Sequence, residues 1–246
     1  MPEERAVLGV YWRDRRATAR EVIRQTHRFV GALQAFHPLF ADRCIVIGNE
    51  VRILPSDLAS FEPLLAEYLA DNAKNRYVNP DPAVTSFTLD STISGGFMVA
   101  LSDPDPAATD DNAAAVRVTA GAWGRLSNSL VVELPPSSPE LRSGSGKALE
   151  LFDLIVEHWS PYFGSLTSSQ LVAELDPDRR NKLRFGVINY LARREAADPC
   201  GTTAIVESRH EGTVLRFDVA FPFSKAADRI RPCFERLVDA GLLNWP

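Results

Sequence analysis

The stretch "VLGVYWRDRRATAREVIRQTHRFVGAL", from Val7 to Leu33, carries the strongest structural signal in the chain. Its first six residues are apolar and β-prone, which predicts a buried strand from Val7 to Trp12. Thr18 and Glu21 have the spacing of a capping box, in which each side chain binds the backbone N–H of the other residue. A helix is therefore predicted from this point to about Phe36, shortly before Pro38.

The predicted helix has one apolar face and one basic face. The residues that gather on the apolar side are Val22, Thr26, Phe29, Val30, Leu33 and Phe36. Arginines recur at intervals of four on the opposite side, at Arg16, Arg20, Arg24 and Arg28. An amphipathic helix with a solvated basic face explains this pattern. Direct binding of nucleic acid is disfavoured, because the sequence pI is about 5.5 and the sequence holds no DNA- or RNA-binding motif.

The composition is that of a protein with a sizeable hydrophobic core. The 246 residues are 45% hydrophobic and 24% charged, and no apolar run reaches the roughly 20 residues of a membrane span. The opening "MPEERAVLGVYW" has acids where a signal peptide has positive charge, so we expect a cytoplasmic protein that binds no membrane. Cys44, Cys200 and Cys233 are widely spaced and form no zinc pattern, so we expect three unpaired thiols.

The net charge of −5 is concentrated in the middle of the chain. Residues 90–157 contain ten acids and four bases, whereas the two flanking segments are nearly neutral. The loop "SDPDPAATDDN" contributes Asp103, Asp105, Asp110 and Asp111. It lacks the glycine and the final glutamate of a calcium-binding loop, so we expect a solvated acidic loop or a loop that binds a basic protein.

Strands and helices cluster along the chain rather than alternate, which predicts an α+β fold. We expect a mainly antiparallel β-sheet packed against several α-helices, in a single domain that spans residues 1–246. The other strands are expected at 84–91 and 97–103 as a hairpin, at 114–121 and 128–135, and at 203–209 and 213–221 as a hairpin that turns at residues 210–212. Further helices are expected at 63–77, 146–159, 169–175 and 225–243, the last one kinked or restarted at Pro232.

The sequence shows no recognisable catalytic set. "LRSGSGKALELF" looks like a phosphate-binding loop, but Leu141 stands where that motif needs glycine and Ala148 where it needs Ser or Thr. The four histidines form no metal-binding spacing: His27, His37, His158 and His210. We therefore expect a binding protein rather than an enzyme, with no cofactor and no metal. A small cytoplasmic enzyme with catalytic residues dispersed along the chain stays an alternative.

Four blocks, in the right order, resemble the immunity protein 52 family of bacterial polymorphic-toxin systems. They are "YWRDRRATAREVIRQTHRFVGALQAFHPLF" (Tyr11–Phe40), "NSLVVELP" (Asn128–Pro135), "FGVINYLARR" (Phe185–Arg194) and "AGLL" (Ala240–Leu243). The second block is the most specific, and together they span nearly the whole chain. The resemblance implies an α+β immunity protein, or antitoxin, that binds and blocks a cognate secreted toxin.

The toxin that the resemblance implies is often a nuclease with a restriction-endonuclease-like fold, delivered by a type VI secretion system. The groove with which a nuclease binds phosphates is basic, so an acidic surface can associate with it fast and occlude it. We hypothesise that the toxin-binding residues are the four aspartates of the acidic loop together with Trp123 and Arg125 of a neighbouring loop, since Trp and Arg are common binding hot spots. An effector chaperone or adaptor is the other alternative.

Overall fold

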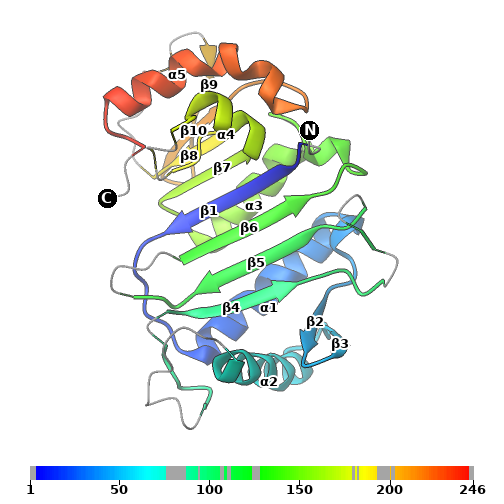
Figure 1. Ribbon diagram of the computed structural model, residues 1–246. Coiled ribbons are helices and arrows are strands. Elements are labelled where there is room, and N and C mark those ends of the chain that lie inside the picture. Colours follow the sequence, from blue (N-terminus) through cyan, green and yellow to red (C-terminus); the bar gives the residue numbers. More distant parts are fainter. Residues whose placement is uncertain are drawn as a thin grey trace. The chain divides into compact units, whose positions relative to one another are not determined.

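The computed structural model describes residues 4–75, 87–93, 95–105, 108–109, 112–123, 128–178, 181, 183–192, 200 and 203–243 (Figure 1). It confirms the predicted α+β class, with antiparallel strand pairs and amphipathic helices. The chain divides into two compact units. Unit 1 comprises Met1–Tyr11 and Val132–Pro246, and unit 2 comprises Trp12–Val131. No described helix is long and apolar enough to cross a membrane.

Unit 1 is built on antiparallel strands in the order β1-β7-β8-β10-β9, with β6 beside β1. The bounds are β1 Ala6–Trp12, β6 Asn128–Leu134, β7 Phe163–Ser168, β8 Ile188–Leu191, β9 Ile205–Arg209 and β10 Gly212–Arg216, with helices α3 Lys147–Trp159, α4 Ser169–Leu175 and α5 Ala227–Asp239. The strand at β1, the three helices and the β9–β10 hairpin were predicted. Pro232 lies inside α5, which runs through it without a restart.

The core of unit 1 forms where α3 meets the sheet. Every residue of β7 is buried, so this strand has no solvent face. Gly164 on β7 allows a close approach, because a Cβ atom there would lie 2.9 Å from a methyl carbon of Val10 and 3.1 Å from the Phe152 ring of α3. Burial of one large apolar side chain contributes about 1.5–3 kcal/mol, so the buried face of α3 holds the helix on the strands.

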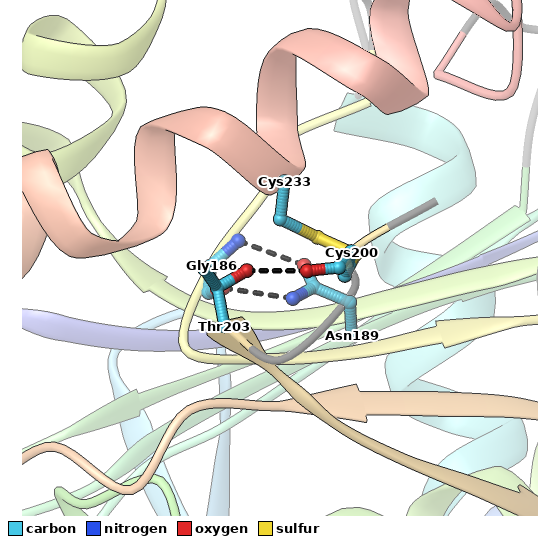
Figure 2. Close-up of a disulfide and its surroundings, with 5 residues drawn as sticks. All are labelled: Gly186, Asn189, Cys200, Thr203 and Cys233. Carbon is cyan, nitrogen blue, oxygen red and sulfur yellow. Dashed lines mark hydrogen bonds between the residues drawn. A yellow bond between two sulfur atoms is a disulfide. The ribbon is translucent and has the colours of Figure 1, made fainter. Parts of the chain in front are cut away.

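A disulfide joins Cys200 to Cys233 on α5, and the expectation of three unpaired thiols was therefore wrong (Figure 2). The two residues are 33 positions apart in sequence, and their Cα atoms are 4.4 Å apart. Cys44 alone is a free, buried thiol. Beside the disulfide, the Thr203 hydroxyl donates to the Cys200 carbonyl at 2.6 Å. The spacing of cysteines in the sequence did not indicate this pairing, because it is the packing of α5 that brings Cys233 next to Cys200.

The disulfide predicts the thiol count of the purified chain. Ellman titration in denaturant without reductant should find one thiol per chain, and titration after reduction should find three. Closing a loop of this length stabilises the folded state by about 3–4 kcal/mol, so Cys233→Ser should lower the free energy of unfolding by a similar amount. Three thiols in the unreduced chain would contradict the pairing.

Unit 2 is built from helices α1 and α2, the hairpin β2–β3, and the strands β4, β5 and the first half of β6, in the order β4-β5-β6. The bounds are α1 Ala19–Phe36, β2 Cys44–Ile47, β3 Glu50–Ile53, α2 Leu58–Asn75, β4 Phe97–Leu101 and β5 Ala115–Ala120. The capping box of α1 is present as predicted: Thr18 and Glu21 bind each other's backbone N–H groups. The helix α2 begins five residues before the predicted start, since Asp57 binds the backbone N–H of Ser60.

The predicted hairpin strand at 84–91 is not formed by the described residues of that segment. Residues 87–93 form turns, and residues 84–86 lie outside the described part. The carbonyl oxygens of Leu89 and Ser91 accept hydrogen bonds from Arg20 and Ala19, both at 2.9 Å. They satisfy N–H groups that the first turn of a helix leaves without partners, which explains why this segment does not pair as a strand.

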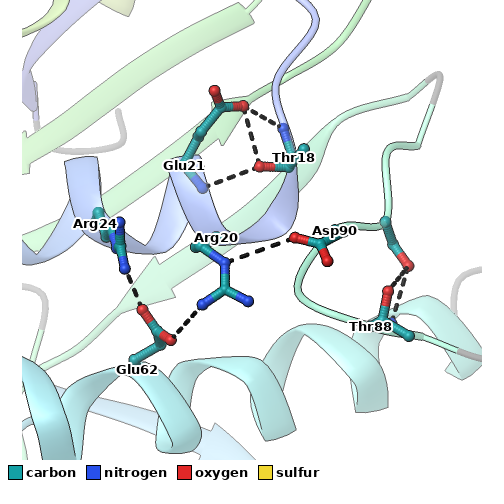
Figure 3. A network of polar contacts seen from close by, with 8 residues as sticks. Thr18, Arg20, Glu21, Arg24, Glu62, Thr88 and Asp90 are labelled. Atoms are coloured by element: carbon teal, nitrogen blue, oxygen red, sulfur yellow. Dashed lines mark hydrogen bonds and ion pairs between the residues drawn. The ribbon is translucent and has the colours of Figure 1, made fainter.

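The basic face of α1 is only partly solvated, contrary to the expectation (Figure 3). Arg20 and Arg24 both reach Glu62 on α2, at 3.1 and 3.4 Å, and Arg20 also approaches Asp90 at 3.6 Å. The Glu62 side chain is 19% exposed, so this carboxylate is shared by two guanidinium groups at the packing surface of the two helices. Two of the four arginines therefore hold α1 against α2.

Candidate protein-binding surface

The β2–β3 hairpin of unit 2 follows from the segment "CIVIGNEVRI". Cys44 pairs with Ile53, and Val46 pairs with Val51. Gly48 begins the two-residue turn with φ of +58°, and glycine at the first central position is typical of a type II′ hairpin turn. No strand was predicted here from the sequence, although Gly-Asn between two β-prone runs is a known hairpin signal.

One face of the hairpin carries apolar side chains that face solvent. Opposed residues of an antiparallel pair share a face, so Val46, Val51 and Ile53 lie together. They are 47%, 56% and 63% exposed, whereas Cys44, the partner of Ile53 on the same face, and Ile45 on the other face are buried. These three residues define what we call the hairpin patch. Exposed apolar groups gathered in this way mark interaction sites.

The acidic loop begins beside the hairpin. An isolated β-bridge joins Cys44 of β2 to Ser102, directly after β4, and Asp103 follows. Asp105 is exposed, and its backbone N–H donates to the Asp103 carboxylate at 3.0 Å. Apolar side chains and carboxylates are thereby brought together in unit 2. The two other aspartates of the hypothesis, Asp110 and Asp111, lie outside the described residues.

Asp103 also has a structural role, because it faces the buried guanidinium of Arg43. The side chain of Arg43 is 1% exposed, and its Nη2 atom lies 3.9 Å from the Asp103 carboxylate. Arg43 donates to the carbonyl of Ala114 at 2.7 Å and to that of Leu39. Burial lowers the pKa of the Arg43 guanidinium, and the negative charge of Asp103 opposes this shift. The carboxylate therefore helps to keep a buried positive charge in place.

Asp103→Ala should lower the free energy of unfolding by about 1–3 kcal/mol, because it leaves a buried charge without its counter-ion. Asp105→Ala is the matched control: it lies in the same loop, keeps its backbone N–H bond, and should change stability by less than about 0.5 kcal/mol. Denaturant unfolding of both variants is the measurement. Equal stability of the two would show that Asp103 does not support Arg43.

Trp123 does not lie with the acidic loop. In the β4–β5 register Leu101 pairs with Val116 and Phe97 with Ala120, so Asp103 and Trp123 follow opposite ends of this strand pair. Trp123 instead contacts Arg16, whose guanidinium lies 5.0 Å from the indole centroid. Arg125 lies outside the described residues. Of the three residues of the hypothesis that the structure describes, Asp103 and Asp105 lie in the acidic loop and Trp123 lies apart from them.

The described histidines have separate surroundings. His27 stacks edge-on against Phe61, His37 caps the short helix at 38–40, and His158 binds the carbonyl of Leu154. His210 pairs with Asp153 on α3 across 57 residues of sequence, a contact that the sequence did not reveal. In the described part of the chain, no group of three or more His, Cys, Asp or Glu side chains could hold a metal ion.

Comparison with known proteins leaves the family undecided. No protein-family model matches the chain, and no curated protein matches it. Among solved structures, the Pseudomonas aeruginosa T6SS protein PA0821 aligns over 98% of this chain and 77% of its own, with 10% sequence identity and a TM-score of 0.47. A structural similarity at that TM-score carries no argument about function. The function is therefore inferred from the sequence and the surfaces of this chain.

Proposed function

We propose that this chain is an immunity protein that binds a cognate secreted toxin, a nuclease effector of a type VI secretion system, and neutralises it by occluding its active site. The partner is the toxin rather than DNA or RNA. The proposal draws on the four sequence blocks that resemble the immunity protein 52 family. In this proposal the chain acts by binding the toxin, so it requires no cofactor and no catalytic group of its own.

The observation that carries the proposal is the hairpin patch beside the acidic loop. An apolar centre with a charged border is the usual anatomy of a specific protein interface. Here the described charges around the patch include the carboxylates of Asp103 and Asp105, and the hairpin itself carries the exposed ion pair of Glu50 and Arg52. A nuclease presents lysines and arginines around the groove that binds phosphates. The patch can pack against the rim of that groove while the carboxylates face the cations.

Occlusion follows from the competition between carboxylates and phosphates. Opposite charge steers the encounter and speeds association, and burial of the apolar side chains slows dissociation. Once the hairpin covers the groove, nucleic acid cannot reach it. Trp123, proposed as a hot spot from the sequence, follows the other end of the β4–β5 pair and would need a separate contact with the toxin.

Co-expression with a candidate toxin encoded by a neighbouring gene tests the proposal. The wild-type chain should restore viability of a sensitive host and should co-purify with the toxin. The double variant Val51→Asp/Ile53→Asp should lose both, with affinity reduced by at least about 100-fold, because two charges replace the centre of the interface. Ile205→Asp is the matched control: this residue is also an exposed strand side chain, at 42%, but in unit 1.

Circular dichroism and thermal unfolding of the variants confirm that loss of binding is not loss of fold. Full rescue by the double variant would contradict the proposed surface, and no rescue by the wild-type chain would contradict the immunity function. Survival without a complex would instead support the enzyme alternative.

The compartment in which the chain acts decides where it can meet its toxin. Disulfides form and persist in oxidising compartments and are rare in the cytosol, so the Cys200–Cys233 bond counts against the cytoplasmic location expected from the N-terminus. A nuclease that attacks the chromosome must be met in the cytoplasm. The co-expression experiment therefore produces both chains in the cytoplasm, and the thiol state of the recovered complex shows whether the reduced chain is the active inhibitor.

A further inference from the structure

A hollow of about 440 Å³ opens in unit 1 where three elements meet. Glu157 and Ser160 come from the end of α3, Tyr190 from β8, and His210 and Glu211 from the turn between β9 and β10. These elements are far apart in the sequence and are joined by the β8–β10–β9 pairing. The hollow lies outside the hairpin patch, which belongs to unit 2.

The backbone around the hollow adopts conformations that its residues disfavour. Ser160, His210 and Glu211 have φ values of 44°, 49° and 64°, and no other described non-glycine residue has a positive φ. A two-residue turn of this type strongly prefers Asn-Gly, so His-Glu is an unfavourable choice for folding alone. Strain of this kind is concentrated at functional sites, although it does not identify a ligand.

The charges at the hollow are negative. Glu157 and Glu211 are exposed carboxylates, and α3 ends here at Ser160, where the helix dipole adds partial negative charge. The Tyr190 hydroxyl donates to the His210 carbonyl at 2.7 Å. Burial raises the pKa of Tyr190, and the negative charge of Glu211 raises it further. Tyr190 and Glu211 both line the hollow.

The positive charges of the β9–β10 hairpin beside the hollow are already paired with carboxylates. Arg209 binds Asp153 and Glu207, and Arg216 binds Glu207 at 2.9 Å. The Nε2 atom of His210 lies 3.2 Å from Asp153. These pairs engage Asp153 and Glu207 and leave Glu157 and Glu211 as the two carboxylates that line the hollow.

We propose that this hollow binds an alkylammonium or guanidinium group. Glu157 and Glu211 accept its N–H donors, and Tyr190, which is 3% exposed, holds the turn that carries Glu211 through its hydrogen bond to the His210 carbonyl. The group is either part of a free small cation, such as a polyamine, or the end of a lysine or arginine side chain of a partner protein. The chemistry of recognition is the same in both cases.

Isothermal titration of the full chain with spermidine and with arginine methyl ester tests the proposal. Saturable binding of at least one of them is expected, while acetate should not bind. Glu157→Gln/Glu211→Gln should weaken the binding by about fivefold or more. Glu235→Gln is the matched control, because Glu235 is an exposed carboxylate on α5 in the same unit and does not line the hollow.

Glu211→Gly separates binding from folding. Glycine adopts a positive φ without strain, so this variant should raise the melting temperature while it weakens cation binding. A purely structural role of Glu211 would not produce opposite changes. Absence of saturable binding, or equal affinities of the wild type and the double glutamine variant, would overturn the proposal.

A second experiment decides the source of the cation. It measures how tightly the toxin binds the wild-type chain and the same double glutamine variant. Weaker toxin binding would show that a toxin side chain occupies the hollow, and unchanged toxin binding would assign the hollow to a free small cation. Because the first arm uses small cations alone, its result is independent of whether the chain is an immunity protein.

Discussion

The buried guanidinium of Arg43 is the constraint on which the hairpin patch depends. It is 1% exposed and joins the carbonyls of Leu39 and Ala114 to the carboxylate of Asp103. A buried charge is costly unless its hydrogen-bonding groups are satisfied, so these segments must meet around the two Nη atoms, whereas the Nε atom has no hydrogen-bond partner among the described residues. The turn after α1, the start of β5 and the end of β4 are thereby fixed together. The β2–β3 hairpin begins at the next residue, Cys44, and its position follows from this arrangement.

The two surfaces of the molecule offer different chemistry for binding. The hairpin patch of unit 2 is apolar and bordered by Asp103 and Asp105, so it suits a macromolecule that buries apolar area against it. The hollow of unit 1 is lined by Glu157, Glu211 and Tyr190, and it has the size and charge for one cationic group. Carboxylates are common to both, in keeping with the net acidity of the chain.

Local signals in the sequence were sufficient to predict some elements of the structure and not others. The capping box at Thr18 predicted the start of α1, because its donors and acceptors are three residues apart. Residues 84–91 were predicted as a strand, but the carbonyls of Leu89 and Ser91 accept hydrogen bonds from the first turn of α1, which only the fold brings near. The pairing of Cys200 with Cys233 and of Asp153 with His210 is likewise a product of packing. The β2–β3 hairpin was predictable, since its Gly-Asn turn stands in the sequence.

Hydrogen–deuterium exchange of the chain, alone and bound to the neighbouring nuclease, tests the central claim most directly, because it maps the contact without any substitution. The account predicts slower exchange in peptides that cover Cys44–Ile53 and the residues after β4, with little change in α5. Protection confined to unit 1, or exchange that is the same with and without the nuclease, would contradict a toxin-binding surface at the hairpin.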